Sequence, residues 1–149
     1  MYNHILISTD GSEVAQKGVD HGLTLAKALG ARVTIVTVTE RFPVYPGAAG
    51  FDYTFSDSLM ADYETGQTEA ANAVLSAAKQ SAERLGVSAE TLHVPNAQPA
   101  EAIVETAKAR NCSLIAMASH GRRGLGRLVL GSQAAEVLAN SPVPVLVVR

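Results

Sequence analysis

The amino-acid sequence predicts an α/β fold, in which a single open five-stranded parallel sheet carries helices on both faces. The first indication is that short runs of β-branched and apolar residues alternate along the chain with segments of helical periodicity. The second is that 149 residues, of which 47% are hydrophobic and 17% charged, suit one globular domain. Because crossovers between parallel strands are right-handed, we expect a doubly wound sheet with strand order 3-2-1-4-5.

The first elements are a strand, a helix and a second strand. Residues 3–8 form an apolar run that stops at the turn-rich residues 9–12, which is typical of a buried strand followed by a loop. Residues 13–29 place apolar side chains at helical spacing, and Gly30 supplies a stop signal. Residues 32–39 are rich in valine, isoleucine and threonine, which predicts the second strand.

The alternation continues to the end of the chain. Three further helices and three further strands are predicted, the helices at residues 61–85, Pro99–Arg110 and 132–140, and the strands at 88–94, Cys112–Ala118 and Val143–Val148.

Residues 40–60 depart from this alternation and predict an irregular, aromatic-rich insertion within the single domain 1–149. Four prolines and glycines fall in this stretch, and six of the seven aromatic residues lie between residues 42 and 63. Long loops in compact domains are lids, binding loops or disordered segments. The alternative is a loop that packs its rings against its own domain or a partner subunit. We expect a docking surface at residues 42–63.

Composition and charge exclude several classes of protein. The net charge of −2 gives no support to nucleic-acid binding, and no apolar run reaches the roughly 18–20 residues of a membrane span. The start of the chain lacks the basic region of a signal peptide. Cys112 is the only cysteine, which excludes an intramolecular disulfide and a multi-thiolate metal site. We expect a cytoplasmic protein that does not insert into membranes.

The carboxy-terminal part of the chain suggests a site for an anion. From residue 111 onward, four arginines accompany one acidic residue, whereas the first 110 residues have an acidic balance. In a doubly wound sheet, ligands bind where the strand order reverses, here beyond the first and fourth strands. This places Asp10 opposite the glycine-rich segment 118–132. Arginines that only serve solubility would give the same count.

Backbone amides of the glycine-rich segment are the candidate phosphate ligands. Gly121 and Gly131 lack side chains, so phosphate oxygens can approach the backbone closely. Gly131 and Ser132 also open the last predicted helix, whose first N–H groups are unpaired and favour negative charge. The alternative is a flexible turn that Ser132 merely caps. P-loop, dinucleotide, flavodoxin and receiver patterns all fit poorly.

Asp10 suits an uncharged polar edge, such as an amino group or a sugar hydroxyl. An adenine would fit between Asp10 and Val38, with its phosphates extending toward Gly121 and Gly131. Locally, Asp10 suits equally well the role of cap for the following helix.

These residues resemble the universal stress protein family, in its ATP-binding branch. The resemblance covers nearly the whole chain, through the opening residues 5–12, the turn 117–121, the helix start 130–132 and the tail 142–148. The family's nucleotide motif is Gly-x2-Gly-x9-Gly-[Ser/Thr]. Here it reads Ala118-x2-Gly121-x9-Gly131-Ser132, with the spacing intact and the first glycine replaced. The added methyl group either weakens nucleotide binding or is tolerated.

The resemblance implies a Rossmann-like fold of the adenine nucleotide alpha hydrolase type. It implies ATP as the ligand, with Mg²⁺ held mainly by phosphate oxygens, and Asp10 at the adenine or ribose, Val38 at the adenine and Gly121 at the phosphates. The full set of expected nucleotide-binding residues is Ser8, Thr9, Asp10, Val38, Met117, Ala118, His120, Gly121, Arg122, Gly131, Ser132 and Gln133. No metal-ligating or catalytic residue is assigned.

The function that the resemblance implies is a nucleotide-dependent regulator in the stress response, which acts on a transporter or another partner and is not an enzyme. The alternatives are a nucleotide-free interaction protein of the same fold and a slow ATP hydrolase. The apolar last strand, with Pro142 and Pro144 beside it, suits a sheet edge. We expect a homodimer that pairs residues 143–148 of two chains, or a higher oligomer.

Overall fold

Strands and helices alternate along the chain in the predicted order. The computed structural model describes residues 1–42, 53–121 and 129–149, with residues 53–56 described as helical backbone only. The strands are β1 (His4–Ser8), β2 (Arg32–Val38), β3 (Ala89–Val94), β4 (Leu114–Ala118) and β5 (Val145–Val148), and the helices are α1 (Glu13–Leu29), α2 (Tyr53–Leu85), α3 (Pro99–Ala109) and α4 (Ser132–Asn140).

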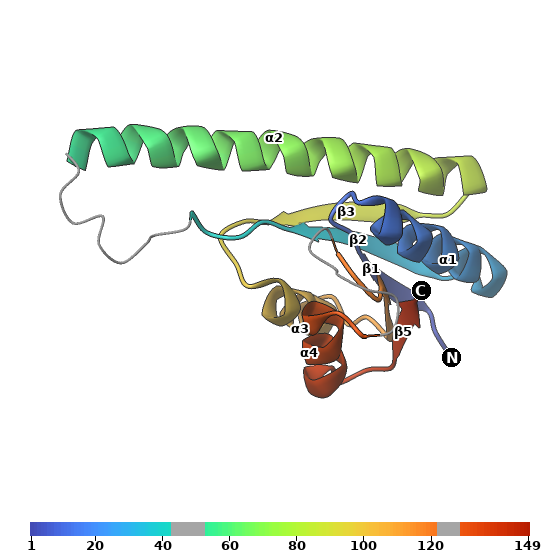
Figure 1. Ribbon diagram of the computed structural model, residues 1–149. Coiled ribbons are helices and arrows are strands. Elements are labelled where there is room, and N and C mark those ends of the chain that lie inside the picture. The colour runs from blue at the N-terminus through green and yellow to red at the C-terminus, as the bar shows by residue number, and fades with distance from the viewer. Residues whose placement is uncertain (43–52, 122–128) are drawn as a thin grey trace.

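The five strands form one parallel sheet in the order β3-β2-β1-β4-β5, which confirms the predicted topology (Figure 1). In the register of the central strands, Ile5 of β1 lies opposite Val33 of β2 and Leu114 of β4. The chain order therefore reverses between β1 and β4, and the loops that follow these two strands leave the same edge of the sheet.

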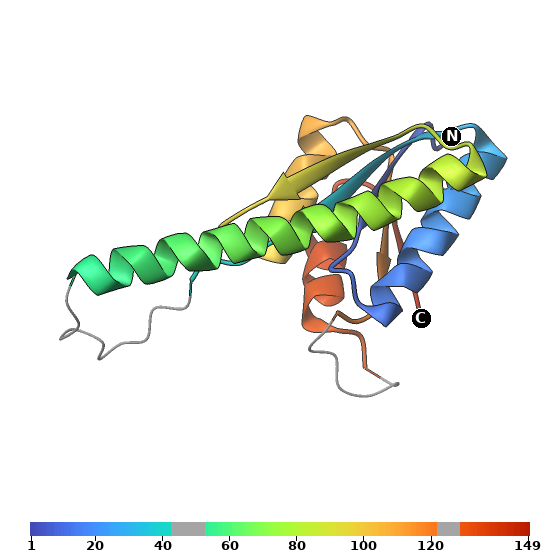
Figure 2. The ribbon, with the colours of Figure 1, turned by 90° about the horizontal axis from the view of Figure 1, so that it is seen from above.

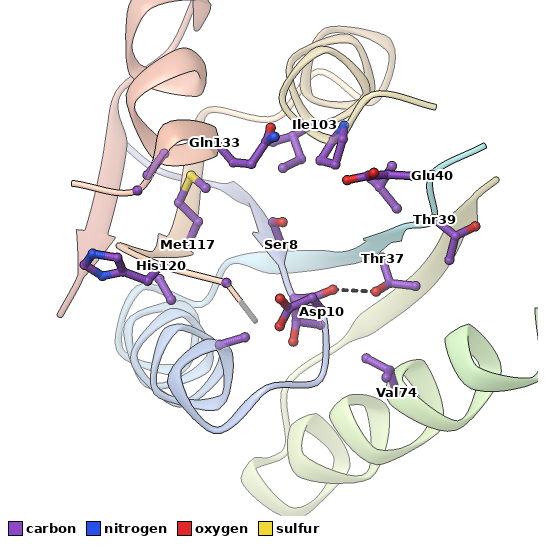
Figure 3. Close-up of a pocket in the computed structure, with 18 of the residues that line it drawn as sticks. Ser8, Asp10, Thr37, Thr39, Glu40, Val74, Ile103, Met117, His120 and Gln133 are labelled. Atoms are coloured by element: carbon purple, nitrogen blue, oxygen red, sulfur yellow. Dashed lines mark hydrogen bonds between the residues drawn. The ribbon is translucent and has the colours of Figure 1, made fainter. Parts of the chain in front are cut away.

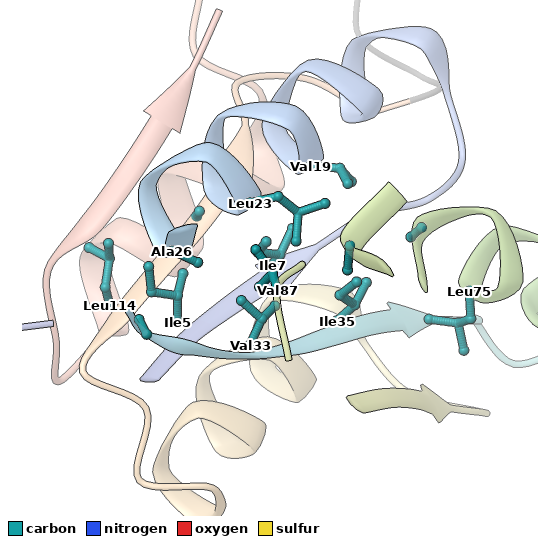
Figure 4. Close-up of a cluster of buried hydrophobic side chains, with 14 residues drawn as sticks. Ile5, Ile7, Val19, Leu23, Ala26, Val33, Ile35, Leu75, Val87 and Leu114 are labelled. Carbon is teal, nitrogen blue, oxygen red and sulfur yellow. The ribbon is translucent and has the colours of Figure 1, made fainter. Parts of the chain in front are cut away.

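Helices cover both faces of the sheet, as predicted. α1 and α2 pack on one face and α3 and α4 on the other (Figures 1 and 2). Alternate residues of each strand feed the two layers, since successive side chains point to opposite faces. The core under α1 and α2 (Figure 4) includes Ile5, Ile7, Val19, Leu23, Val33, Ile35, Leu75, Val87 and Leu114, and the core under α3 and α4 includes Leu6, Val36, Ile103, Ile115, Met117 and Val137.

Local sequence signals account for the ends of α1. Ser12 is the N-cap, and its side chain accepts a hydrogen bond from the Ala15 N–H at 3.1 Å. Gly30 ends the helix with φ of 63°, a left-handed conformation that glycine adopts without steric cost. The loop between β1 and α1 is thus fixed in length and direction.

Helix α2 begins at Tyr53, well before the predicted start at residue 61. The prediction of irregular structure is therefore wrong for residues 53–60, which contain neither proline nor glycine. The amino-terminal half of α2 extends beyond the sheet (Figures 1 and 2). The rest of the predicted insertion, residues 43–52, lies outside the described residues.

The two aromatic residues at the ends of the aromatic-rich segment 42–63 contact each other. The rings of Phe42 and Tyr63 meet edge to face, with centroids 5.1 Å apart. This contact joins the segment after β2 to α2. Within the described part of the chain, no helix is long and apolar enough to cross a membrane.

Candidate functional site

A cavity of about 590 Å³ lies at the edge of the sheet where β1, β2 and β4 end (Figure 3). The loop after β1, the carboxyl end of β2, the turn after β4 and one side each of α2, α3 and α4 form its walls. The predicted site residues that line it are Ser8, Thr9, Asp10, Val38, Met117, Ala118, His120, Gly121, Gly131, Ser132 and Gln133. The remaining predicted residue, Arg122, lies outside the described residues.

The two loops that the sequence places opposite each other do meet. A Cβ atom built on Gly121 would lie 2.7 Å from Oδ2 of Asp10, so the Asp10 carboxylate rests against the backbone of the turn after β4. The Gly131 N–H donates to the Ser119 carbonyl at 2.8 Å, which closes the glycine-rich segment onto the end of β4. The predicted juxtaposition is confirmed.

The turn after β4 itself requires glycine at position 131. A Cβ atom at this position would lie 2.6 Å from the Ser119 carbonyl oxygen. Gly131 is also the N-cap of α4, with no side-chain cap, and its carbonyl accepts the first helical hydrogen bond from Ala135 at 2.9 Å. Ser132 is therefore the first residue of α4 and not its cap. The amides of the first turn lie at the cavity wall, where a helix amino terminus favours anions.

Asp10 does not cap α1, because Ser12 holds that position. Instead its Oδ1 accepts a hydrogen bond from the Ser12 N–H at 2.9 Å, which orders the loop just before the helix. The Thr37 hydroxyl donates to the Thr9 carbonyl and ties the same loop to β2 (Figure 3). These contacts hold the loop that carries the Asp10 carboxylate at the cavity wall.

Several lining residues escaped the sequence analysis. On β2 and just beyond it, Thr37, Thr39 and Glu40 join the predicted Val38. Further wall residues come from helices, among them Tyr63, Gln67, Ala70, Ala71 and Val74 of α2 and Pro99 and Ile103 of α3. The helical periodicity of Ala70 and Val74 indicates a buried stripe, but it does not show that one end of the stripe faces a cavity.

The charged groups that the structure describes in the cavity wall are carboxylates. Asp10 and Glu40 line it, whereas no lysine or arginine does so within the described residues. His120 has its Nδ1 2.8 Å from the Ser119 hydroxyl, and its buried Nε2 has no hydrogen-bond partner among the described residues. No group of three or more His, Cys, Asp or Glu side chains in the described ranges is arranged to hold a metal ion.

Ala118 lies at the end of β4, in a strand whose side chains alternate between the two faces. Ala116 belongs to the core under α1 and Met117 to the core under α3 and α4. Ala118 is two residues from Ala116, so its methyl group lies on the α1 face. The close approach of Gly18 of α1 to the Ala118 backbone agrees with this placement, since a Cβ on Gly18 would lie 2.9 Å from the Ala118 nitrogen.

Comparisons with known proteins agree with this fold and site. The sequence model of the universal stress protein family matches residues 1–149. Universal stress protein MJ0531 of Methanocaldococcus jannaschii is 34% identical over 100% of this chain and 83% of its own length. The structure of hypothetical protein MJ0577 superposes with a TM-score of 0.79 at 28% identity, covering 99% of this chain and 96% of that one. A universal stress protein in complex with cAMP superposes with a TM-score of 0.68 at 26% identity, covering 99% and 97%. The chain belongs to the universal stress protein family.

Proposed function

We propose that this protein binds ATP in the cavity at the ends of β1, β2 and β4, and that it acts as a nucleotide-dependent regulatory module in the cytoplasm. The observation that carries the proposal is that the Asp10 loop and the amino terminus of α4 line the same cavity. Its volume of about 590 Å³ lies within the range of small-molecule sites. The related universal stress protein in complex with cAMP supports an adenine nucleotide as the ligand.

The two ends of the cavity offer different chemistry to the two ends of a nucleotide. Asp10 provides a hydrogen-bond acceptor for the adenine or ribose, and Val38 provides an apolar contact for the ring. Gly121 and the first turn of α4, which begins at Ser132, line the cavity at the phosphate end, whereas the Gly131 N–H is already used by its hydrogen bond to the Ser119 carbonyl, so that Gly131 shapes the turn. Mg²⁺ held by the phosphate oxygens would reduce the repulsion between a triphosphate and the carboxylates of Asp10 and Glu40.

The contacts of His120 support a binding role over catalysis. A hydrolase needs a base that reaches the attacking water. One ring nitrogen of His120 contacts the Ser119 hydroxyl at 2.8 Å, and the other is buried. We therefore assign no catalytic residue, and the bound nucleotide would act by favouring one conformation or partner contact over another.

Isothermal titration with ATP and AMP tests the proposal, together with analysis of nucleotide that co-purifies. We expect binding by the wild type and at least a tenfold loss, about 1.4 kcal/mol, in Asp10→Asn, which keeps Oδ1 for the Ser12 N–H but replaces an acceptor with a donor. Asp20→Asn is the matched control, because Asp20 is exposed on α1 and contacts Gln16 at 2.8 Å. Absence of heat at high micromolar ATP would favour a nucleotide-free interaction protein instead.

The sheet edge supports a second part of the proposal, a homodimer through β5. β5 is an edge strand in the described sheet, and its valines and leucine are apolar. An apolar edge with unpaired backbone groups favours pairing with another strand. The antiparallel partner would be β5 of a second copy.

A further inference from the structure

The side chain of Gln133 links α4 to α3 across the cavity wall. Its Oε1 accepts hydrogen bonds from the Ala100 N–H at 3.0 Å and from Nε2 of Gln98 at 3.4 Å. A backbone N–H can only donate, so this contact fixes which end of the amide is the oxygen. The Gln133 Nε2 makes no hydrogen bond within the described residues, and the side chain lines the cavity (Figure 3).

Gln98 holds this arrangement in place before any ligand arrives. As the N-cap of α3, it accepts a hydrogen bond from the Glu101 N–H at 2.7 Å through Oε1. The opposite atom, Nε2, is thereby directed to α4, where it also donates to Glu136 at 3.0 Å. The Gln133 amide is therefore preorganised by its contacts with α3, which lowers the entropy lost when a ligand binds.

We propose that Gln133 is a specificity-determining residue for the phosphate end of the ligand, with Gln98 as its positioning residue. The inference rests on the proposed function and adds to it a side-chain donor that favours phosphorylated nucleotides over the nucleoside. Gln133 follows Ser132 in the first turn of α4, beside the amides assigned to the phosphates. A phosphate oxygen is a charged acceptor, and hydrogen bonds to charged acceptors are the stronger ones.

The chemistry of the described wall favours this assignment. The carboxylates of Asp10 and Glu40 can only accept hydrogen bonds when ionised, so they cannot bind a phosphate oxygen directly. Gln133 supplies a neutral N–H donor with an orientation fixed by the backbone. An anchored donor of this kind discriminates against a ligand that lacks the acceptor.

Substitution of Gln133 by glutamate removes the Nε2 donor but keeps an oxygen that can accept the hydrogen bonds from α3. In Gln133→Glu, a carboxylate oxygen still accepts from Ala100 and Gln98, but the donor becomes a negative charge. We expect ATP and AMP to bind about 10–100-fold more weakly, while adenosine, followed by NMR titration, changes by less than about twofold. Gln133→Met removes the donor without adding charge and should lose about tenfold for ATP. Unchanged ATP affinity, or an equal loss for adenosine, would overturn the assignment.

A double-mutant cycle tests the positioning role of Gln98. Gln98→Ser keeps a capping hydroxyl for α3 but cannot reach Gln133. We expect it to weaken ATP binding about threefold to tenfold in the wild type and to have no further effect in Gln133→Met. Additive losses would show that Gln98 acts only on the stability of α3. Circular dichroism of each variant verifies that the fold is retained.

The same titrations distinguish the two levels of the proposal. A wild type that binds neither ATP nor AMP refutes the proposed function and this inference with it. A wild type that binds ATP while Gln133→Glu binds it equally well refutes only the role of Gln133.

Discussion

Ala118 stands where the motif of the family has its first glycine, and its methyl group lies on the face of β4 that packs under α1. The neighbouring Met117 lies on the opposite face. The departure from the motif therefore adds a methyl group at a buried position of the cavity wall, on the side of β4 that faces α1.

We expect Ala118→Gly to leave the affinity for ATP within about twofold of the wild type, because the methyl group is buried on the side of β4 that packs under α1. The free energy of unfolding should fall by about 0.5–1 kcal/mol, since glycine loses more backbone entropy on folding than alanine. Titration calorimetry and chemical denaturation measure the two effects. A large gain in affinity in Ala118→Gly would show that the methyl group obstructs the ligand.

His4 lies buried at the amino end of β1, at the opposite end of the sheet from the cavity. Thr34 donates to Glu90 at 2.8 Å, so His4 Nε2 donates to the Thr34 hydroxyl at 2.8 Å. The other ring nitrogen is buried, and it has no hydrogen-bond partner within the part of the chain that the structure describes. Burial first, and the charge of Arg32 second, lower the pKa of His4 from its ordinary value of 6.5. His4 is therefore neutral in the folded protein at neutral pH.

A histidine whose pKa is lowered by folding destabilises the protein as the solution becomes acidic. Below 6.5 the unfolded chain binds a proton that the folded chain does not, so the free energy of unfolding decreases with falling pH. We expect His4→Gln to reduce the loss of stability between about pH 7.5 and about pH 5.5, measured by urea denaturation. The loss should not vanish, because burial also lowers the pKa of His93.

His21→Gln is the control for this experiment. His21 is exposed on α1, with its Nδ1 2.9 Å from the Lys17 carbonyl oxygen. We expect it to retain the pH dependence of the wild type. If His4→Gln retains it as well, the buried network around His4 is not the source of the effect.

At the scale of single residues, the sequence identified the site by the chemistry of its loops. Asp10, Gly121 and Gly131 were predictable because turn residues after strands collect at one edge of a parallel sheet. Glu40 was not, because it begins a stretch that looks irregular, and Thr39 was predicted only as the last residue of the second strand. The amide of Gln133 was predicted only by position, since its contacts with α3 depend on tertiary packing.

At the scale of secondary-structure elements, the position of the site residues depends on where each helix begins. Gly131 lets α4 start directly against the Ser119 carbonyl, while Gly66 in α2 has open space where its Cβ would be. We expect Gly131→Ala to destabilise the protein by about 1–3 kcal/mol and to abolish ATP binding, because the turn must move. Gly66→Ala should leave stability unchanged or raise it by up to about 1 kcal/mol, since alanine favours the helix.

Thermal unfolding and titration of both glycine variants give the comparison. A stable Gly131→Ala that binds ATP like the wild type would show that the close approach to Ser119 is dispensable. Gly66→Ala is the control for any general effect of replacing glycine by alanine in a helix.

The limits of prediction at this scale are seen in α2 and β5. Helix α2 starts earlier than predicted. The prediction was late because the prolines and glycines at 43–50 made the whole segment 40–60 look irregular, although residues 53–60 contain none. β5 begins at Val145, two residues later than expected, because Pro144 has no N–H to donate; its carbonyl still accepts from Ile115 at 3.0 Å. The sequence predicted the alternation of strands and helices, whereas the residues at which these elements begin and end depend on tertiary contacts.

In the whole molecule, the sheet leaves β5 with one edge available for a second chain. The carbonyls of Pro144 and Val148 accept hydrogen bonds from β4. Backbone groups alternate in direction along a strand, so those of Val145 and Val147 face the outer edge. A dimer through β5 would therefore use the backbone hydrogen-bonding groups of Val145 and Val147.

We expect Val147→Pro to convert a dimer into a monomer, because proline removes an outward N–H without breaking a hydrogen bond to β4. Light scattering at micromolar concentration measures the change. Val147→Ala keeps the N–H and should remain dimeric. A monomeric wild type, or a dimeric Val147→Pro, would contradict pairing through β5.

The most direct test of the whole account is to locate ATP on the folded protein by amide NMR. Titration of isotopically labelled protein with ATP should shift the amide signals of Asp10, Val38, Gly121 and Ser132, which line the cavity, and leave those at the far end of the sheet, such as Ser88 and Ser113, in place. Absence of any shift, or shifts that gather at the far end, would contradict the central claim that ATP binds where the strand order reverses.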